Sequence, residues 1–405
     1  MSEGYDHIAA SIAFEPTDGY RRLRESCPVH RVAEHEPPFY VVGRFDDVVD
    51  TLKNPGLWAN RFGPGVFYQQ SGVLGTTDDP DHARHRAVLR NAFVPTSVAK
   101  LAPRLVAVAD ELLDEMVPLG GGDFVELFAA PFPAYGIGEL LGVPAADRAL
   151  FRQMSETVVA ALTGGDVGEY ERSKEALGDY VDARLADREA RGGPGHGAGA
   201  ATWAAEDATA DDALDALLAA RADGRLSAGE VRHIGHQLLV AGHETTTSLL
   251  GMMLFRLLER PLILQQLRDD PALIPRAVEE ALRFDSPVNG LFRTNVEATV
   301  LHDTEIAAGT KLQVLYASAN RDETRFPDPD EFRLDRSQHE IGRHVAFGWG
   351  LHHCIGAPLA RLEARVAFER ILARMADIEL DGEPVRNESF VLHGLTRLPL
   401  RWRPT

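Results

Sequence analysis

The residue with the most distinctive chemical setting is a cysteine in a glycine-rich segment. Cys354 stands in FGWGLHHCIG at positions 347–356, and Pro358 fits the first turn of a helix that we expect to run to about Ala376. A thiolate just before a helix N-terminus is stabilised by exposed amides and by the positive end of the helix dipole. Glycines let the backbone press against a flat partner, and Phe347 would add an aromatic wall. The segment therefore predicts a thiolate beside a flat group.

The residues alone leave other interpretations of Cys354 open. A lone thiol in a protein of this kind is usually buried and inert. It could also be a nucleophile with His352 or His353 as its base, although residues this close in sequence seldom point the right way. A CxxCH haem-attachment site is excluded, because the residue three before Cys354 is Leu351 and the residue after it is not histidine. The glycines do not complete the nucleotide-binding pattern GxGxxG either.

A second segment, VAGHETTT at 240–247, breaks helical preferences in the middle of a long apolar pattern. Glycine costs about 1 kcal/mol relative to alanine inside a helix, and a carboxylate and three β-branched residues follow it. Ala241 and Gly242 would leave room for a wide group, and Thr245 can bond to a carbonyl one turn back. A kinked helix with a solvated Glu244 is the alternative. The zinc-protease motif HExxH is absent, because threonine stands where its second histidine belongs.

The helix that carries this segment is the clearest predicted element. Ser227 and Glu230 form a capping box, and apolar periodicity continues to about Leu258, before Arg260-Pro261. Roughly 30 residues at 1.5 Å each span about 45 Å, enough to cross a domain. The pattern as a whole predicts a mainly α fold with a small β part. Further helices are expected over 83–93 and 101–116, and short strands over 38–42, 299–301 and 311–315.

Composition limits the class of protein. The 405 residues are 44% hydrophobic and 25% charged, as in an ordinary globular protein. The surplus of 61 acidic over 42 basic residues, a net charge of −19, argues against nucleic-acid binding. Two cysteines cannot build a disulfide framework, an all-cysteine iron–sulfur cluster or a Cys₄ zinc site. Without an apolar run near the roughly 20 residues of a membrane span and without a signal peptide, we expect a cytoplasmic protein.

Four segments resemble patterns of the cytochrome P450 superfamily, and they come in the family's order. The cysteine segment meets every fixed position of the haem-binding loop F-G-x-G-x-H-x-C-x-G. AGHETT at 241–246 is similar to the oxygen-binding pattern A-G-x-[DE]-T-[TS], and EALR at 280–283 to E-x-x-R. Residues 78–86 resemble the bacterial pattern D-P-P-x-H-x-x-x-R, with Asp79 in place of the first proline.

The resemblance implies a single cytochrome P450 domain over 1–405, with a flexible surface loop at 192–210. The fold would be mainly α with a small β part, and haem b (iron protoporphyrin IX) would lie between the long helix and the cysteine loop. Cys354 would be the axial ligand of the iron, its thiolate favouring cleavage of the O–O bond. Ala241 and Gly242 would give oxygen room, while Thr245 and Glu244 would deliver protons.

The resemblance also implies how the haem is held. Propionates need positive partners, and His82 and Arg86, four residues apart, share one helix face. The family pattern assigns these two to the propionates together with His352 and Arg293. Glu280 and Arg283 would form a buried structural network with a later arginine, Arg336. The cofactor-binding residues implied are Cys354, His82, Arg86, Arg293, His352, Phe347, Gly348, Gly356, Ala241 and Gly242.

The implied activity is a monooxygenase that hydroxylates or otherwise oxidises a lipophilic substrate with O₂. Electrons would come ultimately from NAD(P)H through a ferredoxin-type donor and its reductase, because the chain has no spare flavin domain and too few cysteines for a cluster. Arg343, Arg361 and Arg365 could form a local basic dock. A peroxygenase, dehydratase or isomerase, a gas sensor and a haem-free cysteine hydrolase are the alternatives, and we expect a monomer.

The substrate is the least determined part. In this family the loop before the first haem-contacting helix caps the pocket, and here it corresponds to residues 61–77. An apolar and aromatic lining fits a small to medium molecule such as a terpenoid, steroid, aromatic or polyketide. The candidate substrate contacts are Phe67, Val240, Val288, Asn289, Leu291 and Val391.

Overall fold

The computed structural model describes residues 5–69, 72–144, 147, 150, 153–154, 167–190 and 213–405. The loop predicted at 192–210 lies outside the described residues. The α-helices are α1 (His7–Ile12), α2 (Thr17–Ser26), α3 (Phe45–Lys53), α4 (Asp81–Phe93), α5 (Pro95–Val98), α6 (Ala102–Met116), α7 (Pro131–Leu141), α9 (Val167–Ala190), α10 (Ala213–Ala222), α11 (Ala228–Leu258), α12 (Pro261–Asp269), α13 (Ile274–Phe284), α14 (Tyr316–Ala319), α15 (Gln338–Ile341) and α16 (Ala357–Arg374). The strands are β1 (Val29–Val32), β2 (Phe39–Val42), β3 (Trp58–Ala59), β4 (Gly121–Asp123), β5 (Leu291–Asn295), β6 (Thr299–Leu301), β7 (Thr304–Ile306), β8 (Lys311–Val314), β9 (Met375–Leu380), β10 (Val385–Arg386), β11 (Leu395–Arg397) and β12 (Pro399–Pro404).

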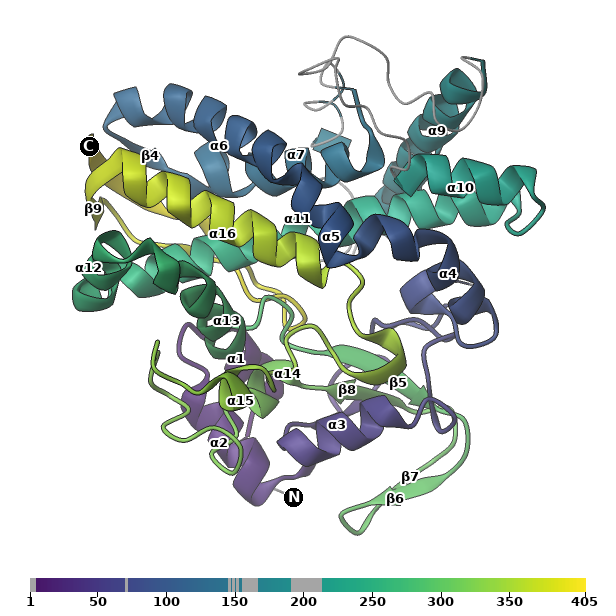
Figure 1. Ribbon diagram of the computed structural model, residues 1–405. Coiled ribbons are helices and arrows are strands. Elements are labelled where there is room, and N and C mark those ends of the chain that lie inside the picture. Colours follow the sequence, from purple (N-terminus) through teal and green to yellow (C-terminus); the bar gives the residue numbers. More distant parts are fainter. Residues whose placement is uncertain are drawn as a thin grey trace.

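The long helix α11 is the axis of the helical part. Its N-terminus carries the expected capping box between Ser227 and Glu230, and the helix is continuous through the 240–247 segment. It packs against α7, α9 and α16, with α16 crossing in front of it and α6 packed against α16 (Figure 1). The largest apolar core lies among these helices. The mainly α architecture predicted from the sequence is therefore confirmed.

The main sheet lies on the other side of the molecule, away from α6 and α16, whereas β4, β9 and β12 form a small sheet beside those helices (Figure 1). A five-stranded sheet has the order β1-β2-β8-β5-β3, with β2 and β8 parallel and the other pairs antiparallel. The β6–β7 hairpin projects from one edge of the molecule (Figure 1).

The last long helix ends at Arg374 rather than near Ala376, because Met375–Leu380 forms β9 and pairs with β12.

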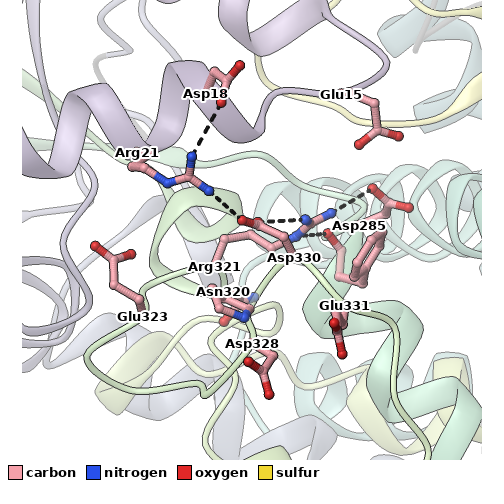
Figure 2. A network of polar contacts seen from close by, with 12 residues as sticks. Glu15, Asp18, Arg21, Asp285, Asn320, Arg321, Glu323, Asp328, Asp330 and Glu331 are labelled. Carbon is pink, nitrogen blue, oxygen red and sulfur yellow. Dashed lines mark hydrogen bonds and ion pairs between the residues drawn. The ribbon is translucent and has the colours of Figure 1, made fainter.

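A network of charged side chains ties the N-terminal segment to the core (Figure 2). Arg21 contacts both Asp18 and Asp330, and Asp330 also pairs with Arg321 at 3.2 Å. Arg321 is buried with its guanidinium 3.5 Å from the centre of the Phe284 ring. The Nε of Arg321 also donates to the Phe284 carbonyl at 2.8 Å, so the network reaches from α2 to the end of α13.

A second buried network surrounds Glu280 on α13. Its carboxylate accepts hydrogen bonds from Arg283 at 2.7 and 2.8 Å and from the Arg336 Nε at 2.9 and 3.1 Å. The backbone N–H of Arg333 donates to the same carboxylate. Breaking a buried ion pair on one side leaves an uncompensated charge and is strongly destabilising. These residues therefore join α13 to the segment before the cysteine loop.

Among the described helices, none is by itself long and apolar enough to cross a membrane. One pair bent by 40°, residues 81–93 with 95–119, passes that test by length and composition only.

Candidate active site

Two glycines shape the cysteine loop. Gly348 and Gly350 have φ of +69° and +70°, a left-handed conformation that other residues rarely adopt. A Cβ at Gly350 would lie 2.9 Å from the Leu52 carbonyl oxygen, so the loop also needs the missing side chain for close packing on α3. The loop is closed by a hydrogen bond of 2.9 Å from the Cys354 N–H to the Phe347 carbonyl. This turn places Cys354 directly before α16.

The Cys354 thiol has opposing influences on its charge. Cys354 is exposed, yet the protein packed around its sulfur partly desolvates the thiol and raises its pKa, and this is the largest effect. The backbone amides of Gly356 and Ala357 and the positive charges of Arg86 and Arg361 act in the opposite direction and lower the pKa. Amide donors at the start of a helix stabilise a thiolate. The site therefore has the donors that a metal-ligating thiolate needs.

The contacts and exposure of residues 241–245 explain the unusual sequence at the centre of α11. The Thr245 hydroxyl donates to the Ala241 carbonyl at 2.9 Å, as the sequence predicted. Ala241 is exposed although it lies halfway along a largely buried helix, and Glu244 and Thr245 are half-buried. Gly242 also has a packing role that the sequence did not predict. A Cβ there would lie 2.9 Å from Cγ1 of Ile137, so this glycine serves the close approach of α7.

The four residues expected to hold the propionates come together from separate elements. The rings of His82 on α4 and His352 in the cysteine loop have centroids 4.2 Å apart. Burial lowers the pKa of His352 to about 3, and the positive charges of Arg293, His82 and Arg86 add to this. Arg86 donates to the carbonyl of His353 at 2.8 Å. The cluster is thus electropositive and partly enclosed.

This cluster fits a group that carries carboxylates. Both ring nitrogens of His352 are buried without a hydrogen-bond partner. Within the described part of the chain, no aspartate or glutamate forms an ion pair with Arg86 or Arg293. Buried cations normally have an anionic partner, because loss of hydration is costly otherwise. The residues present therefore match the two propionates of a haem.

Asp79, the departure from the family pattern, caps α4. Its carboxylate accepts a hydrogen bond of 3.0 Å from the Ala83 N–H and lies 3.4 Å from Nδ1 of His82. An acidic group at a helix N-terminus stabilises the helix through the unpaired amides and the dipole. The substitution of the proline therefore leaves His82 and Arg86 in place on the same helix.

Comparisons with known proteins support the same conclusion as the geometry of the site. A family profile described as cytochrome P450 matches residues 169–396. Cytochrome P450 107B1 of Saccharopolyspora erythraea is 37% identical over 404 residues, covering 94% of this chain and 94% of that protein. The chain belongs to the cytochrome P450 family. This family implies a haem whose iron is bound by a cysteine thiolate.

Other relatives of this cytochrome P450 agree in sequence and in fold. The cytochrome P450 monooxygenase PikC of Streptomyces venezuelae is 37% identical and covers 98% of this chain and 93% of its own. The solved structure of CYP109Q5 from Chondromyces apiculatus has a TM-score of 0.85 at 34% identity, covering 99% of this chain and 98% of that chain. The expected fold and the expected monooxygenase class are both confirmed.

The residues expected to contact substrate do not share one environment. Val240, Val288, Leu291 and Val391 are half-buried, while Phe67 is 63% exposed. Asn289 is fully buried. Its amide accepts from the Tyr20 hydroxyl at 3.2 Å and donates to the Ser11 carbonyl at 3.1 Å. The Asn289 side chain thus contacts the N-terminal segment, while its backbone N–H donates to the Val391 carbonyl at 2.7 Å.

A cavity of about 420 Å³ opens beside Cys354, between α4 and the start of α16. Three of its lining residues are arginines, Arg86, Arg90 and Arg361, and none is acidic. Arg361 pairs with Glu279 at 2.6 Å and stacks on the Phe347 ring at 4.5 Å, so its charge is partly balanced. The basic character of this face therefore includes α4, which the sequence analysis did not consider.

Sequence reasoning missed three residues near the site. Tyr316 is buried near Arg293, and the positive charge of Arg293 opposes the rise in the Tyr316 pKa that burial causes. Glu279 binds both Arg361 and His344, and nothing in its spacing distinguished it from neighbouring carboxylates. Lys311 is a fully buried lysine at the start of β8. A lone cation in an otherwise apolar strand pattern is a signal that could have indicated this residue.

Proposed function

We propose that this cytochrome P450 oxidises a small to medium lipophilic substrate with electrons delivered by a separate protein. One observation carries the proposal. Cys354, with backbone amides at the start of α16, stands beside a partly buried group of basic residues in which neither Arg86 nor Arg293 pairs with a carboxylate among the described residues. That combination provides a thiolate ligand and two carboxylate sites in one place.

Different residues of the chain would bind the haem and deliver protons. When bound, the haem supplies the activation of dioxygen, and the cysteine thiolate favours O–O bond cleavage. Cys354 would hold the iron, and Arg86 and Arg293 would bind propionates. Thr245 would hold and pass a proton at its Oγ1, because a hydroxyl can both accept and donate. Glu244, on the same half-buried stretch of α11, would resupply that proton.

The electron donor would bind at the arginine-lined cavity beside Cys354. The chain is acidic overall, with a net charge of −19, so a basic patch on its surface is a local feature. Complementary charge steers association and fixes orientation. We infer a ferredoxin-type donor with an acidic face, reduced by an NAD(P)H-dependent reductase.

The half-buried candidates Val240, Val288, Leu291 and Val391 support a lipophilic substrate. A related structure supports the same class. CYP109E1 from Bacillus megaterium, solved in complex with testosterone, has a TM-score of 0.83 at 29% identity, covering 96% of this chain and 98% of its own.

A titration with lipophiles tests this proposal. The purified protein should be red, and a subset of a panel of steroids, terpenes and aromatic compounds should shift its Soret band as water leaves the iron. A folded, colourless protein would contradict haem binding. A red protein on which no member of the panel causes a shift would contradict the lipophilic substrate class.

The ligand assignment has its own test. Cys354→Ser should abolish the thiolate-type spectrum of the carbon-monoxide complex, because serine supplies no thiolate to the iron. Cys27→Ser is the matched control, since Cys27 is the other cysteine and is buried in a separate core. An unchanged spectrum in Cys354→Ser would remove the basis of the proposal.

A further inference from the structure

Lys311 is a buried cation in an unusual setting. Its side chain is 0% exposed, and its Nζ donates to the carbonyl oxygens of Phe62 and Gly63, each at 2.8 Å. The Nζ also lies 4.9 Å from the centre of the Tyr68 ring. No carboxylate pairs with it among the described residues. A buried ammonium is costly to desolvate, so these contacts must compensate for lost water.

The partners of Lys311 belong to one compact loop, residues 60–69. The loop folds back on itself through a hydrogen bond of 3.0 Å from the Gln69 N–H to the Phe62 carbonyl. Gly63 has φ of +88°, a left-handed turn that suits glycine. Lys311 therefore binds the inside of a formed turn. It donates to the Phe62 carbonyl, which also accepts from the Gln69 N–H, and to the Gly63 carbonyl.

Few other polar contacts hold this loop to the sheet. The Phe292 N–H donates to the Pro64 carbonyl at 2.8 Å, and the Tyr68 hydroxyl donates to the Gly309 carbonyl at 2.5 Å. Of the apolar side chains in the loop, Val66 is buried in the cluster beneath it, whereas Phe67 is 63% exposed. The two bonds from Lys311 are charge-assisted and so are stronger than neutral ones.

We propose that Lys311 is a positioning residue that latches the 60–69 loop onto β5 and β8 and thereby limits how fast a lipophilic ligand reaches the pocket. The access part rests on the proposed function and on the expectation, from the family resemblance, that residues 61–77 cap the pocket. The latch itself rests only on the contacts of Lys311. Removing the ammonium should loosen the loop without disturbing the helices.

The latch should weaken in alkaline solution. Burial, and to a lesser degree the positive charge of Arg293, lower the pKa of Lys311 to about 8. The groups that face it are Arg293 from β5 and the Tyr68 ring from the loop. Below this pKa the ammonium makes two charge-assisted bonds, and above it a neutral amine makes weaker ones. Loop opening should therefore rise between pH 7 and 9.

Hydrogen exchange of the holoenzyme tests the latch without a substrate. In Lys311→Met, amides of the 60–69 loop should exchange about tenfold faster or more, since losing a charge-assisted bond costs at least one factor of ten in the opening equilibrium. The β6–β7 hairpin should be unchanged. Lys100→Met, which removes an exposed lysine, is the control. Equal loop exchange in Lys311→Met and wild type would overturn the latch.

The pH dependence separates charge from packing. After correction for intrinsic exchange, opening of the loop should increase from pH 7 to 9 in wild type. It should stay flat in Lys311→Arg, because arginine remains charged throughout this range. A wild-type loop that opens equally at pH 7 and 9 would contradict the role of the charge, even if Lys311→Arg does not fold.

Ligand access is measured with phenylimidazole, which binds haem iron and shifts the Soret band. Its association rate should rise severalfold in Lys311→Met and stay at the wild-type value in Lys100→Met. Faster loop exchange with an unchanged association rate would overturn the control of access but not the latch. A wild-type protein whose Soret band does not respond to phenylimidazole would overturn the proposed function, while the exchange result stands.

Discussion

Charge at the proposed propionate site is divided among the four basic residues. Burial lowers the pKa of both His352 and His82, so both rings are neutral near pH 7. Arg86 and Arg293 remain charged, because a guanidinium does not lose its proton in this range. Two permanent cations thus match two carboxylates, and the neutral rings can still donate N–H groups. This balance avoids placing four full charges together.

Thr245 should control coupling between electron use and product formation. Thr245→Ala removes the hydroxyl that accepts and passes the proton, and general acid–base groups contribute about a hundredfold or more to rate. We expect product formed per NAD(P)H consumed to fall at least about tenfold, with a matching rise in free hydrogen peroxide. Both are measured in a reconstituted assay with substrate.

Thr245→Ser keeps a hydroxyl at the same position and is the matched control. Its coupling should stay close to that of wild type. If Thr245→Ala remained fully coupled, the hydroxyl would have no part in proton delivery, and its bond to the Ala241 carbonyl would be only a local helix contact.

At the scale of elements, α11 depends on close contact with its neighbours. Gly242→Ala would place a Cβ 2.9 Å from Cγ1 of Ile137, so α7 must shift. Overpacking of this kind costs roughly 1–3 kcal/mol. Urea unfolding should show this loss of stability in Gly242→Ala.

Gly229→Ala, near the N-terminus of the same helix, is the control. Nothing lies within 4 Å of a Cβ at Gly229. The variant should be unchanged or more stable by up to about 1 kcal/mol, because alanine has the higher helix propensity. Equal stability of the two variants would show that α7 does not need the missing side chain at Gly242.

Helices α7, α11 and α16 meet at a buried carboxyl group, that of Glu363. It is 0% exposed, it leaves no room for a Cβ at Gly136, and neither oxygen has a hydrogen-bond partner. Burial raises the pKa of Glu363 well above its ordinary 4.5, and the nearby Thr246 hydroxyl offsets this only in part. The folded protein therefore keeps this proton at pH values where the unfolded chain has released it.

This linkage makes stability fall as pH rises above 4.5, the ordinary pKa, by up to about 1.4 kcal/mol per pH unit, until the folded-state pKa is reached. Glu363→Gln cannot ionise, so its stability should not fall in this way as pH rises. Its stability relative to wild type should increase between pH 5 and 8 in urea unfolding. Glu369→Gln, on the same helix but paired with Arg365, is the control. A constant difference between Glu363→Gln and wild type would show that Glu363 does not carry the linkage.

For the whole molecule, an acidic protein presents a small basic face beside its cysteine. Arg90→Glu should slow electron transfer from an acidic ferredoxin by roughly tenfold at low salt, because steering by charge raises association rates by at least that factor. The effect should fade as salt is added. Stopped-flow reduction of the carbon-monoxide complex measures both.

Arg397→Glu makes the same change of charge on β11, outside the cavity that Arg90 lines. It should leave the rate of reduction unchanged. If both variants slowed reduction equally, the net charge of the molecule rather than this face would govern the encounter.

Local spacing allowed much of the site to be predicted. The loop around Cys354 and the capped helix from Ser227 are determined within a few residues, because glycine conformation and capping depend on near neighbours. The family resemblance added the roles of residues that spacing alone could not connect. Arg336 is one of these, since it lies 56 residues from Glu280 in sequence.

Other features depend on packing between distant segments, which the spacing of residues along the chain does not reveal. Asn289 was expected to contact substrate, yet its amide contacts Tyr20 and Ser11, more than 260 residues away. Gly242 was expected to give oxygen room, and the structure shows in addition that its missing Cβ allows Ile137 to approach. Nothing in either residue's own segment indicates these partners.

The sequence by itself determined the cysteine, its turn, the long helix and the family. These depend on hydrogen bonds and backbone conformations between residues close in the chain. Only the tertiary structure decided where Arg293 and His352 meet His82 and Arg86, and that Lys311 binds the 60–69 loop. Such clusters form when distant segments lose water together, and the free energy of that burial belongs to the packed molecule rather than to any one segment.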